Sequence, residues 1–233
     1  MGAQTWLQIG DELPRFFGYY NLIFFAKALG VTFALSAVGC IVGFTLGFAL
    51  AAVRMTTRPA TRPLRIAATV FIELFRRIPF LVTLMLVFFV FQALHADLSM
   101  FTVALISVCL IATAFIAEIV RSGLESVHQN QWDAALTLNF SYLQTLRMVI
   151  VPQAWKIILP PVFGFFVLFI KDTALASQIG VIELAFAGKT MNNKGFSATL
   201  VYGTVLALYF MLSYPLARFG QYLERRLAPT RNR

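Results

Sequence analysis

Residues 121–161 of this 233-residue chain read RSGLESVHQNQWDAALTLNFSYLQTLRMVIVPQAWKIILPP, a largely polar stretch between long apolar runs. Good helix formers stand at Ala134, Ala135 and Leu136, so the stretch is not a structureless loop. The apolar runs around it approach or exceed the roughly 20 residues that cross a bilayer. The sequence therefore predicts an ordered, amphipathic segment kept outside the membrane, as expected if a partner docks on it.

The polar stretch contains start and stop signals of two short helices. Asn130 is a candidate N-cap, which places Asp133 in the first turn, where the helix dipole favours a carboxylate. Asn139 tolerates the left-handed conformation and predicts a break, after which Ser141–Gln144 matches a capping box that restarts a helix. The two helices, about residues 130–150, would form a rigid unit that we call the knob. Local physics also allows a merely amphipathic surface helix there.

The rest of the chain predicts an all-α membrane protein with five spans. Its composition is 59% hydrophobic and 12% charged, about half the charged fraction of a soluble domain. A membrane β-barrel is excluded because the apolar runs are continuous and lack an alternation of period two. The expected spans are residues 22–53, 66–94, 98–119, 157–170 (or onward to 182, across Lys171-Asp172-Thr173) and 196–217, with Pro152 and Pro160-Pro161 marking the return from the knob.

Two of these spans carry further signals. Gly39, Gly43 and Gly47 follow one another at four-residue spacing in the first span and predict the close approach of another helix. The second span is interrupted by Phe75-Arg76-Arg77-Ile78-Pro79, where the proline predicts a break. Two arginines in lipid would cost several kcal/mol, so either residues 66–74 form an interfacial helix or the arginines face a protein interior.

The net charge of +9 is distributed as in a membrane protein, which favours a lipid environment over nucleic acid as a partner. Arginines cluster at residues 54–65, where Pro59 and Pro63 break the helix, at 121–156, and in the tail. Placing these segments in the cytoplasm puts the N-terminus outside and the C-terminus inside, and leaves only Lys189 and Lys194 as cations in the outer loops. The first span is the expected insertion signal, because Met1–Leu13 lacks a basic region.

The cysteines and histidines indicate no metal site. Cys40 and Cys109 lie inside apolar runs and are expected to be small core residues rather than a disulfide. His95 and His128 stand far apart at span edges.

Several motifs resemble a known family of membrane proteins. Asp133-Ala134-Ala135, then Asn139, then Val151-Pro152 resembles the "EAA" loop of the permease subunits of ABC importers. More narrowly, the chain is similar to permeases of polar amino acids, of the histidine, glutamate, glutamine and arginine type. Seven segments fall in the expected order: Phe75–Pro79, Ala117–Arg121, Gln144–Arg147, Val151–Ala154, Lys171–Ala174, Ile179–Val181 and Leu223–Arg226.

This resemblance implies a type I importer permease fold with a cytoplasmic coupling helix. It implies three parts: an N-terminal segment at 1–21, a transmembrane domain at 22–222 with a coupling loop at about 122–156, and a cytoplasmic tail at 223–233. Two permeases, identical or sister chains, would form the pore, and a substrate-binding protein would deliver the amino acid. Each knob would bind in a groove of an ATPase subunit, and the ATPase subunits would bind ATP and Mg²⁺. The permease itself binds no cofactor and is not an enzyme, since it lacks a Walker-type Gly-rich loop.

The resemblance assigns contact with the ATPase to Trp132, Asp133, Ala134, Ala135, Leu138 and Asn139. The sequence departs from the family pattern at two of these positions. Asp133 replaces the usual glutamate, which keeps the charge but shortens its reach, and Asn139 replaces the usual glycine. These departures are expected to narrow the choice of ATPase without abolishing docking.

Ionisable residues within a span indicate where substrate binds. An amino acid needs an acceptor for its ammonium group, for which Asp172 is the candidate, and donors for its carboxylate, for which Thr173 and Ser177 are candidates. The alternative is that Lys171 and Asp172 pair with groups such as Arg76 or Glu118 and only hold the fold. Lys171, Gly164, Phe165 and Thr113 complete the candidate substrate-binding set.

The resemblance also suggests which amino acid is transported, through the pair Gly164-Phe165. Relatives that carry cationic amino acids have Asn-Glu at this place, so the missing carboxylate favours a neutral polar or acidic substrate. Glu118 is expected to pair with Arg121, and Glu73, Arg76 and Arg77 to brace the fold rather than line the pore. A stand-alone secondary transporter or channel is the alternative function. Five spans without a visible internal repeat argue against it.

Overall fold

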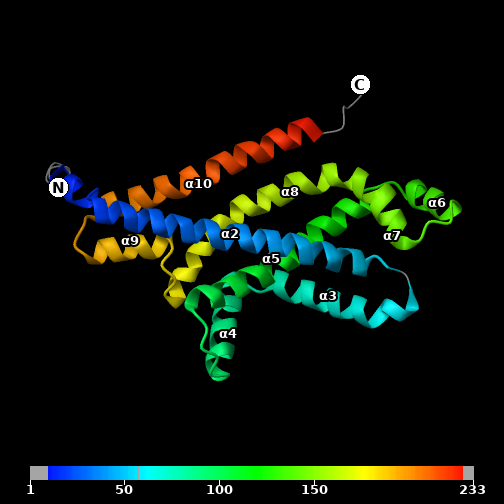
Figure 1. The fold of residues 1–233 in the computed structure, drawn as a ribbon, viewed down its shortest axis with the longest axis horizontal. Coiled ribbons are helices and arrows are strands. Elements are labelled where there is room, and N and C mark those ends of the chain that lie inside the picture. Colours follow the sequence, from blue (N-terminus) through cyan, green and yellow to red (C-terminus); the bar gives the residue numbers. More distant parts are fainter. Residues whose placement is uncertain (1–9, 57, 228–233) are drawn as a thin grey trace.

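The structure is a computed structural model that describes residues 10–56 and 58–227, all of whose regular elements are helical. The main helices are α2 (Tyr19–Arg54), α3 (Arg62–Arg77), α4 (Phe80–Ala93), α5 (Met100–Glu125), α6 (Gln129–Thr137), α7 (Tyr142–Gln144), α8 (Val151–Asp172), α9 (Leu184–Asn193) and α10 (Ala198–Leu227). Figure 1 shows the long helices side by side, with α6 and α7 at one end and α9 toward the other.

Five spans fit these helices. Four runs are long and apolar enough to cross a membrane: α2, α5, the run Tyr142–Ile179, and α10. A fifth results if the bent pair Pro59–Arg77 and Phe80–Ala93 counts as one broken span, with a bend of 113°. The predicted break at Pro79 is therefore confirmed, whereas Pro63 starts α3 instead of ending a helix. A fixed φ and a missing N–H group suit the first turn of a helix.

Helices α2 and α5 approach closely through glycine, as predicted. A Cβ atom built on Gly43 would lie 2.6 Å from the Cβ of Ala112, and one built on Gly47 would lie 2.8 Å from the backbone nitrogen of Ala117. Such distances leave room only for hydrogen. The spacing of these glycines therefore brings the two backbones together.

The knob has the predicted two-helix form with a different first cap. The His128 side chain, and not Asn130, accepts a hydrogen bond from a backbone N–H group at the start of α6, so Asp133 lies beyond the first turn. Asn139 has a φ of +57°, and Ser141 and Gln144 form a complete capping box at the start of α7. The break and the restart are thus confirmed, while the first cap lies two residues earlier than predicted, at His128 instead of Asn130.

The helix that follows the knob is longer than its prolines suggested. A π-helical turn, η2 (Thr145–Ile150), joins α7 to α8, and Pro160 and Pro161 lie inside α8 instead of interrupting the chain. A 3₁₀ turn, η3 (Thr173–Ile179), continues the same run to Gly180, whose φ is +89°. The extension of the fourth span past Lys171-Asp172-Thr173 is therefore confirmed nearly to residue 182.

Residues 184–193 form α9, where the sequence led us to expect a loop. The Glu183 side chain caps this helix by accepting hydrogen bonds from the backbone N–H groups of Ala185 and Phe186. The triplet Gly188-Lys189-Thr190 lies within α9, and Glu183 occupies the position where a phosphate-binding loop has its first glycine. The local resemblance to such a loop is therefore limited to three residues.

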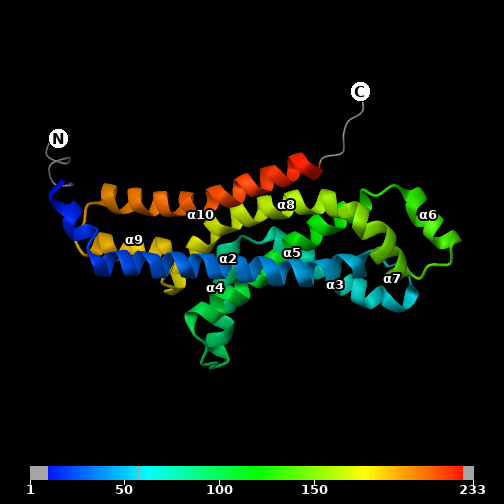
Figure 2. The same cartoon turned by 45° about the horizontal axis from the view of Figure 1, so that its top comes forward.

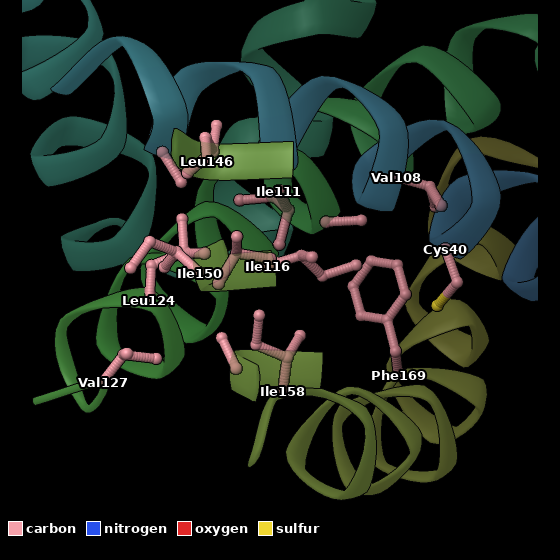
Figure 3. Close-up of a cluster of buried hydrophobic side chains, with 14 residues drawn as sticks. Cys40, Val108, Ile111, Ile116, Leu124, Val127, Leu146, Ile150, Ile158 and Phe169 are labelled. Carbon is pink, nitrogen blue, oxygen red and sulfur yellow. The ribbon is translucent and has the colours of Figure 1, made fainter. Parts of the chain in front are cut away.

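The main hydrophobic core runs lengthwise between the knob and the middle of the membrane helices. It begins with Leu146 and Ile150 of η2, passes Leu124 and Ile116 of α5, and ends at Phe169 of α8. Figure 3 shows these side chains pointing toward one another from separate helices. Figure 2 shows α10 lying along α8, on the outside of this core.

Candidate functional site

A cavity of about 300 Å³ lies where the second span is broken. Its wall comes from the break between α3 and α4, from α5 and from α8, and we call it the break cavity. The wall combines aromatic rings with charged groups, namely Phe80, Phe115, Phe165, Phe169, Arg76, Arg77 and Asp172. A mostly apolar recess with a few charged groups is the usual form of a small-molecule site.

The aromatic part of the wall is a stack of rings. Phe165 lies between Phe115 and Phe169, with ring centroids 5.5 and 5.0 Å apart and planes within 23° of parallel. The guanidinium group of Arg76 lies over the Phe115 ring at 5.8 Å from its centroid. A cation over an aromatic face is a favourable arrangement, and it fixes Arg76 at the edge of the cavity.

Asp172 supplies the negative charge of the break cavity. Its side chain is half-buried, and within residues 10–56 and 58–227 no cationic side chain lies within 4.0 Å of its carboxylate. Among the described residues, the alternative ion pairs of Asp172 with Arg76 and of Lys171 with Glu118 are therefore not formed within 4.0 Å. Arg77, the other arginine of this wall, donates two hydrogen bonds to Glu73 on its own helix, at 2.9 and 2.7 Å.

A cluster of ion pairs centres on Glu118 of α5. Its carboxylate contacts Arg54 of α2 at 3.0 Å, Arg76 of α3 at 3.6 Å, and Arg121 one turn along its own helix. The predicted pair of Glu118 and Arg121 is confirmed. The Arg54 contact joins residues 64 positions apart, and helix periodicity gives no sign of it.

The other predicted substrate residues do not line the break cavity. Thr173 is fully buried and its hydroxyl donates to the carbonyl of Ile170 at 2.7 Å, and Ser177 is buried as well. Lys171 is exposed. Gly164 lines a separate recess of about 220 Å³ between α8 and α10, and Thr113 lines an apolar groove between α2, α3 and α5. Of the candidate set, the structure brings only Asp172 and Phe165 together, and a role in binding for the others stays a prediction.

The knob is tied to the membrane helices by specific contacts. The Tyr142 hydroxyl donates to the carbonyl of Ala52, near the end of α2, at 2.6 Å. The Trp132 ring stacks on Tyr142, and the Gln153 amide of α8 donates to Gln131 of α6 at 3.2 Å. Ala135 lies on the buried face of α6. These contacts explain why the knob holds one position.

The outer face of the knob is apolar and exposed. Leu136, Leu138, Leu143 and Met148 are each more than 60% exposed, although they lie at the end of the molecule farthest from α9. Asp133, Ala134 and Asn139 are exposed beside them. Exposed apolar side chains gathered in one segment are typical of surfaces that contact another protein or the membrane.

Known proteins match most of this chain in sequence. Residues 43–229 match the family described as "Binding-protein-dependent transport system inner membrane component". The chain is 36% identical to the probable amino-acid ABC transporter permease protein YckA of Bacillus subtilis, over 71% of this chain and 73% of that protein. It is 35% identical to the glutamine transport system permease protein GlnP of Escherichia coli, over 69% and 74%.

A solved structure shows the same fold. The crystal structure of an amino acid ABC transporter with histidines has a chain that superposes with a TM-score of 0.80 at 27% sequence identity. The match covers 88% of this chain and 94% of that one.

Proposed function

Because this chain belongs to the family of binding-protein-dependent transport system inner membrane components, we propose that its break cavity is where the transported molecule is held during passage. The chain is a multi-pass inner-membrane protein and the permease subunit of an amino-acid ABC importer. The cargo is therefore an amino acid, which carries an ammonium group, a carboxylate and a side chain. The break cavity offers a counterpart for each.

The observation that carries the proposal is the carboxylate of Asp172, which lies in the cavity wall with no cation within 4.0 Å among the described residues. A charge inside a membrane span is costly and needs a counter-ion. The ammonium group of an amino acid is a counter-ion of the right sign and size. Asp172 would thus hold the amino acid by its ammonium group while the ring of Phe165 packs on its side chain.

The balance of charge in the cavity favours a neutral or acidic amino acid. Two arginines and one aspartate line the wall, and the Gly164-Phe165 pair provides no second carboxylate. A cationic side chain would meet Arg76 in a cavity whose one carboxylate, that of Asp172, already holds the ammonium group of the amino acid, and like charges at close range in a span are unfavourable. An uncharged or acidic side chain meets no such obstacle.

The test is uptake into vesicles that contain the assembled importer, with L-glutamine, L-glutamate, L-histidine and L-arginine as substrates. We expect uptake of a neutral or acidic member and none of arginine. Asp172→Asn should lower uptake about 10- to 100-fold, the value of a lost charged hydrogen bond. Asp97→Asn removes the same charge from an exposed turn and is the control. Efficient uptake of arginine would contradict the substrate class, and normal uptake by Asp172→Asn would contradict the site.

We also propose that the knob is the docking element for an ABC ATPase, which holds ATP and Mg²⁺. The support is the apolar patch of Leu136, Leu138, Leu143 and Met148, held firmly by the Tyr142 and Trp132 contacts. A short helix with apolar anchors that enters a groove is a common recognition mode. Closure of the ATPase pair would move two knobs together and open the paired permeases to a substrate-binding protein outside.

Affinity purification from native membranes in mild detergent tests this second part. The wild-type chain should recover an ATPase, together with any sister permease. Leu138→Glu should lose the ATPase, whereas Leu94→Glu should keep it. Leu94 is a matched control because both leucines are 68% exposed and Leu94 lies at the end of α4, away from the knob. Equal recovery with both variants would show that the patch is not the docking surface.

A further inference from the structure

We propose that Arg76 is the receptor for the α-carboxylate of the transported amino acid, and that it exchanges its contact with Glu118 for that carboxylate when the cavity fills. The inference rests on the function proposed above and assigns to Arg76 a role other than the bracing that the sequence suggested. Arg76 would therefore be the residue that connects the break cavity to the ion-pair cluster of Glu118.

The position of Arg76 is the first observation. It lines the break cavity, and it also lines a second cavity of about 320 Å³ that contains Glu118 and Arg121. Phe115 is the other residue that lines both cavities, and the Arg76 guanidinium lies over its ring. The guanidinium group of Arg76 thus lies between the break cavity and the carboxylate of Glu118, which it contacts in this structure.

The strength of its present contact is the second observation. Arg76 lies 3.6 Å from Glu118, whereas Arg54 lies 3.0 Å away and Arg121 contacts both oxygens of the same carboxylate. Arg76 is also the most exposed of the three, at 34% against 16% and 27%. A guanidinium group has five N–H donors, so a single long contact leaves most of them available.

The alternatives in the same wall are less suitable. Arg77 donates two short hydrogen bonds to Glu73 and its side chain is 79% exposed, so its charge is already satisfied away from the cavity. Asp172 has the wrong sign for a carboxylate. An arginine with free donors is the side chain best suited to bind a carboxylate through two parallel hydrogen bonds.

The exchange leaves the rest of the cluster intact. When Arg76 turns to the substrate, Glu118 keeps Arg54 and Arg121 as counter-ions, so its carboxylate is not left without an ionic partner. Glu118 lies near the end of α5, which leads directly to the knob through Ser126 and His128. Occupancy of the cavity would therefore change the ion pairs at the base of the knob, and ATPase docking would change substrate affinity by the same factor.

The test measures direct binding to the purified complex of permease and ATPase, without the binding protein. The probes are L-glutamine, L-glutamate and L-histidine, each beside its α-carboxamide, which lacks only the carboxylate charge. The wild-type complex should bind its preferred amino acid about 10- to 100-fold more tightly than the carboxamide, as expected for a charged hydrogen bond. Arg76→Gln should abolish this preference, and Arg76→Lys should keep part of it.

Arg77→Gln is the matched control, because it removes the same charge one residue along the same wall and should retain the preference. A merely structural Arg76 predicts that Arg76→Gln weakens the acid and the carboxamide equally, and that result would overturn the inference. So would loss of the preference in Arg77→Gln alone. Failure of the proposed function would give a different result, because the wild-type importer would then take up none of the neutral or acidic amino acids.

Discussion

Asn139 is the single residue on which the shape of the knob depends. Its φ of +57° lets the chain leave α6 and reverse, with the Phe140 N–H donating to Ala135 at 3.1 Å. A branched side chain in this conformation costs about 1–2 kcal/mol. The sequence predicted this feature because it depends on one residue and its immediate neighbours.

Asn139→Val should therefore loosen α6, while Asn139→Gly should not. The valine clashes with its own backbone in the left-handed conformation, whereas glycine adopts it freely. Hydrogen exchange of the α6 amides should be about 5- to 30-fold faster in the valine variant, the equivalent of 1–2 kcal/mol. Identical exchange in the two variants would show that the reversal is held by other contacts.

Glu183 is the residue that fixes α9 against the rest of the molecule. It is fully buried and accepts hydrogen bonds from two backbone N–H groups and from the Tyr209 hydroxyl at 2.8 Å. Glu183→Ala should destabilise the protein by about 2–4 kcal/mol, through the lost cap and the unpaired donors. Tyr209→Phe removes one of these bonds and should cost about 1 kcal/mol. Thermal unfolding in detergent measures both, and a larger loss in Tyr209→Phe would contradict this ranking.

At the scale of helices, the contact of α2 with α5 shows what spacing alone can predict. Gly39, Gly43 and Gly47 lie on one face because they are four residues apart, and each meets α5. Gly43→Ala should lower stability by about 1–3 kcal/mol, since the added methyl group overlaps Ala112. Gly30→Ala, in the same helix with open space around it, should be neutral or slightly stabilising. Thermal unfolding compares them, and equal effects would mean that α2 and α5 can separate without loss.

The link between the knob and α2 was not visible in the sequence. Tyr142 and Ala52 are 90 residues apart, and no periodicity relates them. Tyr142→Phe removes this hydrogen bond and should lower the amount of substrate moved per ATP hydrolysed. We expect a loss of about 2- to 10-fold, which corresponds to the free energy of one hydrogen bond. Tyr222→Phe, whose hydroxyl only accepts from Arg226 one turn away, should change nothing. A normal ratio in Tyr142→Phe would show that the remaining contacts of the knob, such as the Trp132 stack and the Gln153 hydrogen bond, hold it without this bond.

The sequence predicted the membrane-spanning helices but missed the short helix α9, and it did not predict most of the polar contacts between helices. The spans, the break at Pro79 and the capping box follow from patterns within about 20 residues. The contact of Arg54 with Glu118 depends on how distant helices pack. The cap at His128 was missed because histidine is an unusual capping residue. Gly164 and Phe165 are adjacent in α8, so they point about 100° apart and do not share a cavity.

For the whole molecule, the ends of the helices carry different charge. Arg54, Arg65 and Arg121 gather around one recess near the knob, while Lys189 and Lys194 lie at α9, beside the N-terminal residues, where Glu12 accepts from the Ser197 N–H. From the excess of arginine we expect the knob end to be cytoplasmic. The distribution of charge over the loops of the sequence predicts the same orientation.

Cysteine labelling decides the orientation. With Cys40 and Cys109 replaced by alanine, Asn193→Cys should react with an impermeant maleimide in intact cells, and Gln129→Cys only in inverted vesicles. Both positions are exposed, so a difference reports the side of the membrane rather than burial. The reverse pattern would invert the topology and place the knob outside, beyond the reach of any ATPase.

The π-helical turn at Thr145–Ile150 has a consequence for how the length of this chain can vary. A π turn holds one more residue than an α-helical turn, so it accommodates an extra residue without changing the faces of the helices on either side. Deleting one residue there would restore a regular helix and keep the present orientation of the knob on α8. The same deletion in α8 would rotate everything before it by about 100°. The turn is therefore the place where the loss of a single residue is compatible with the packing of the helices on both sides.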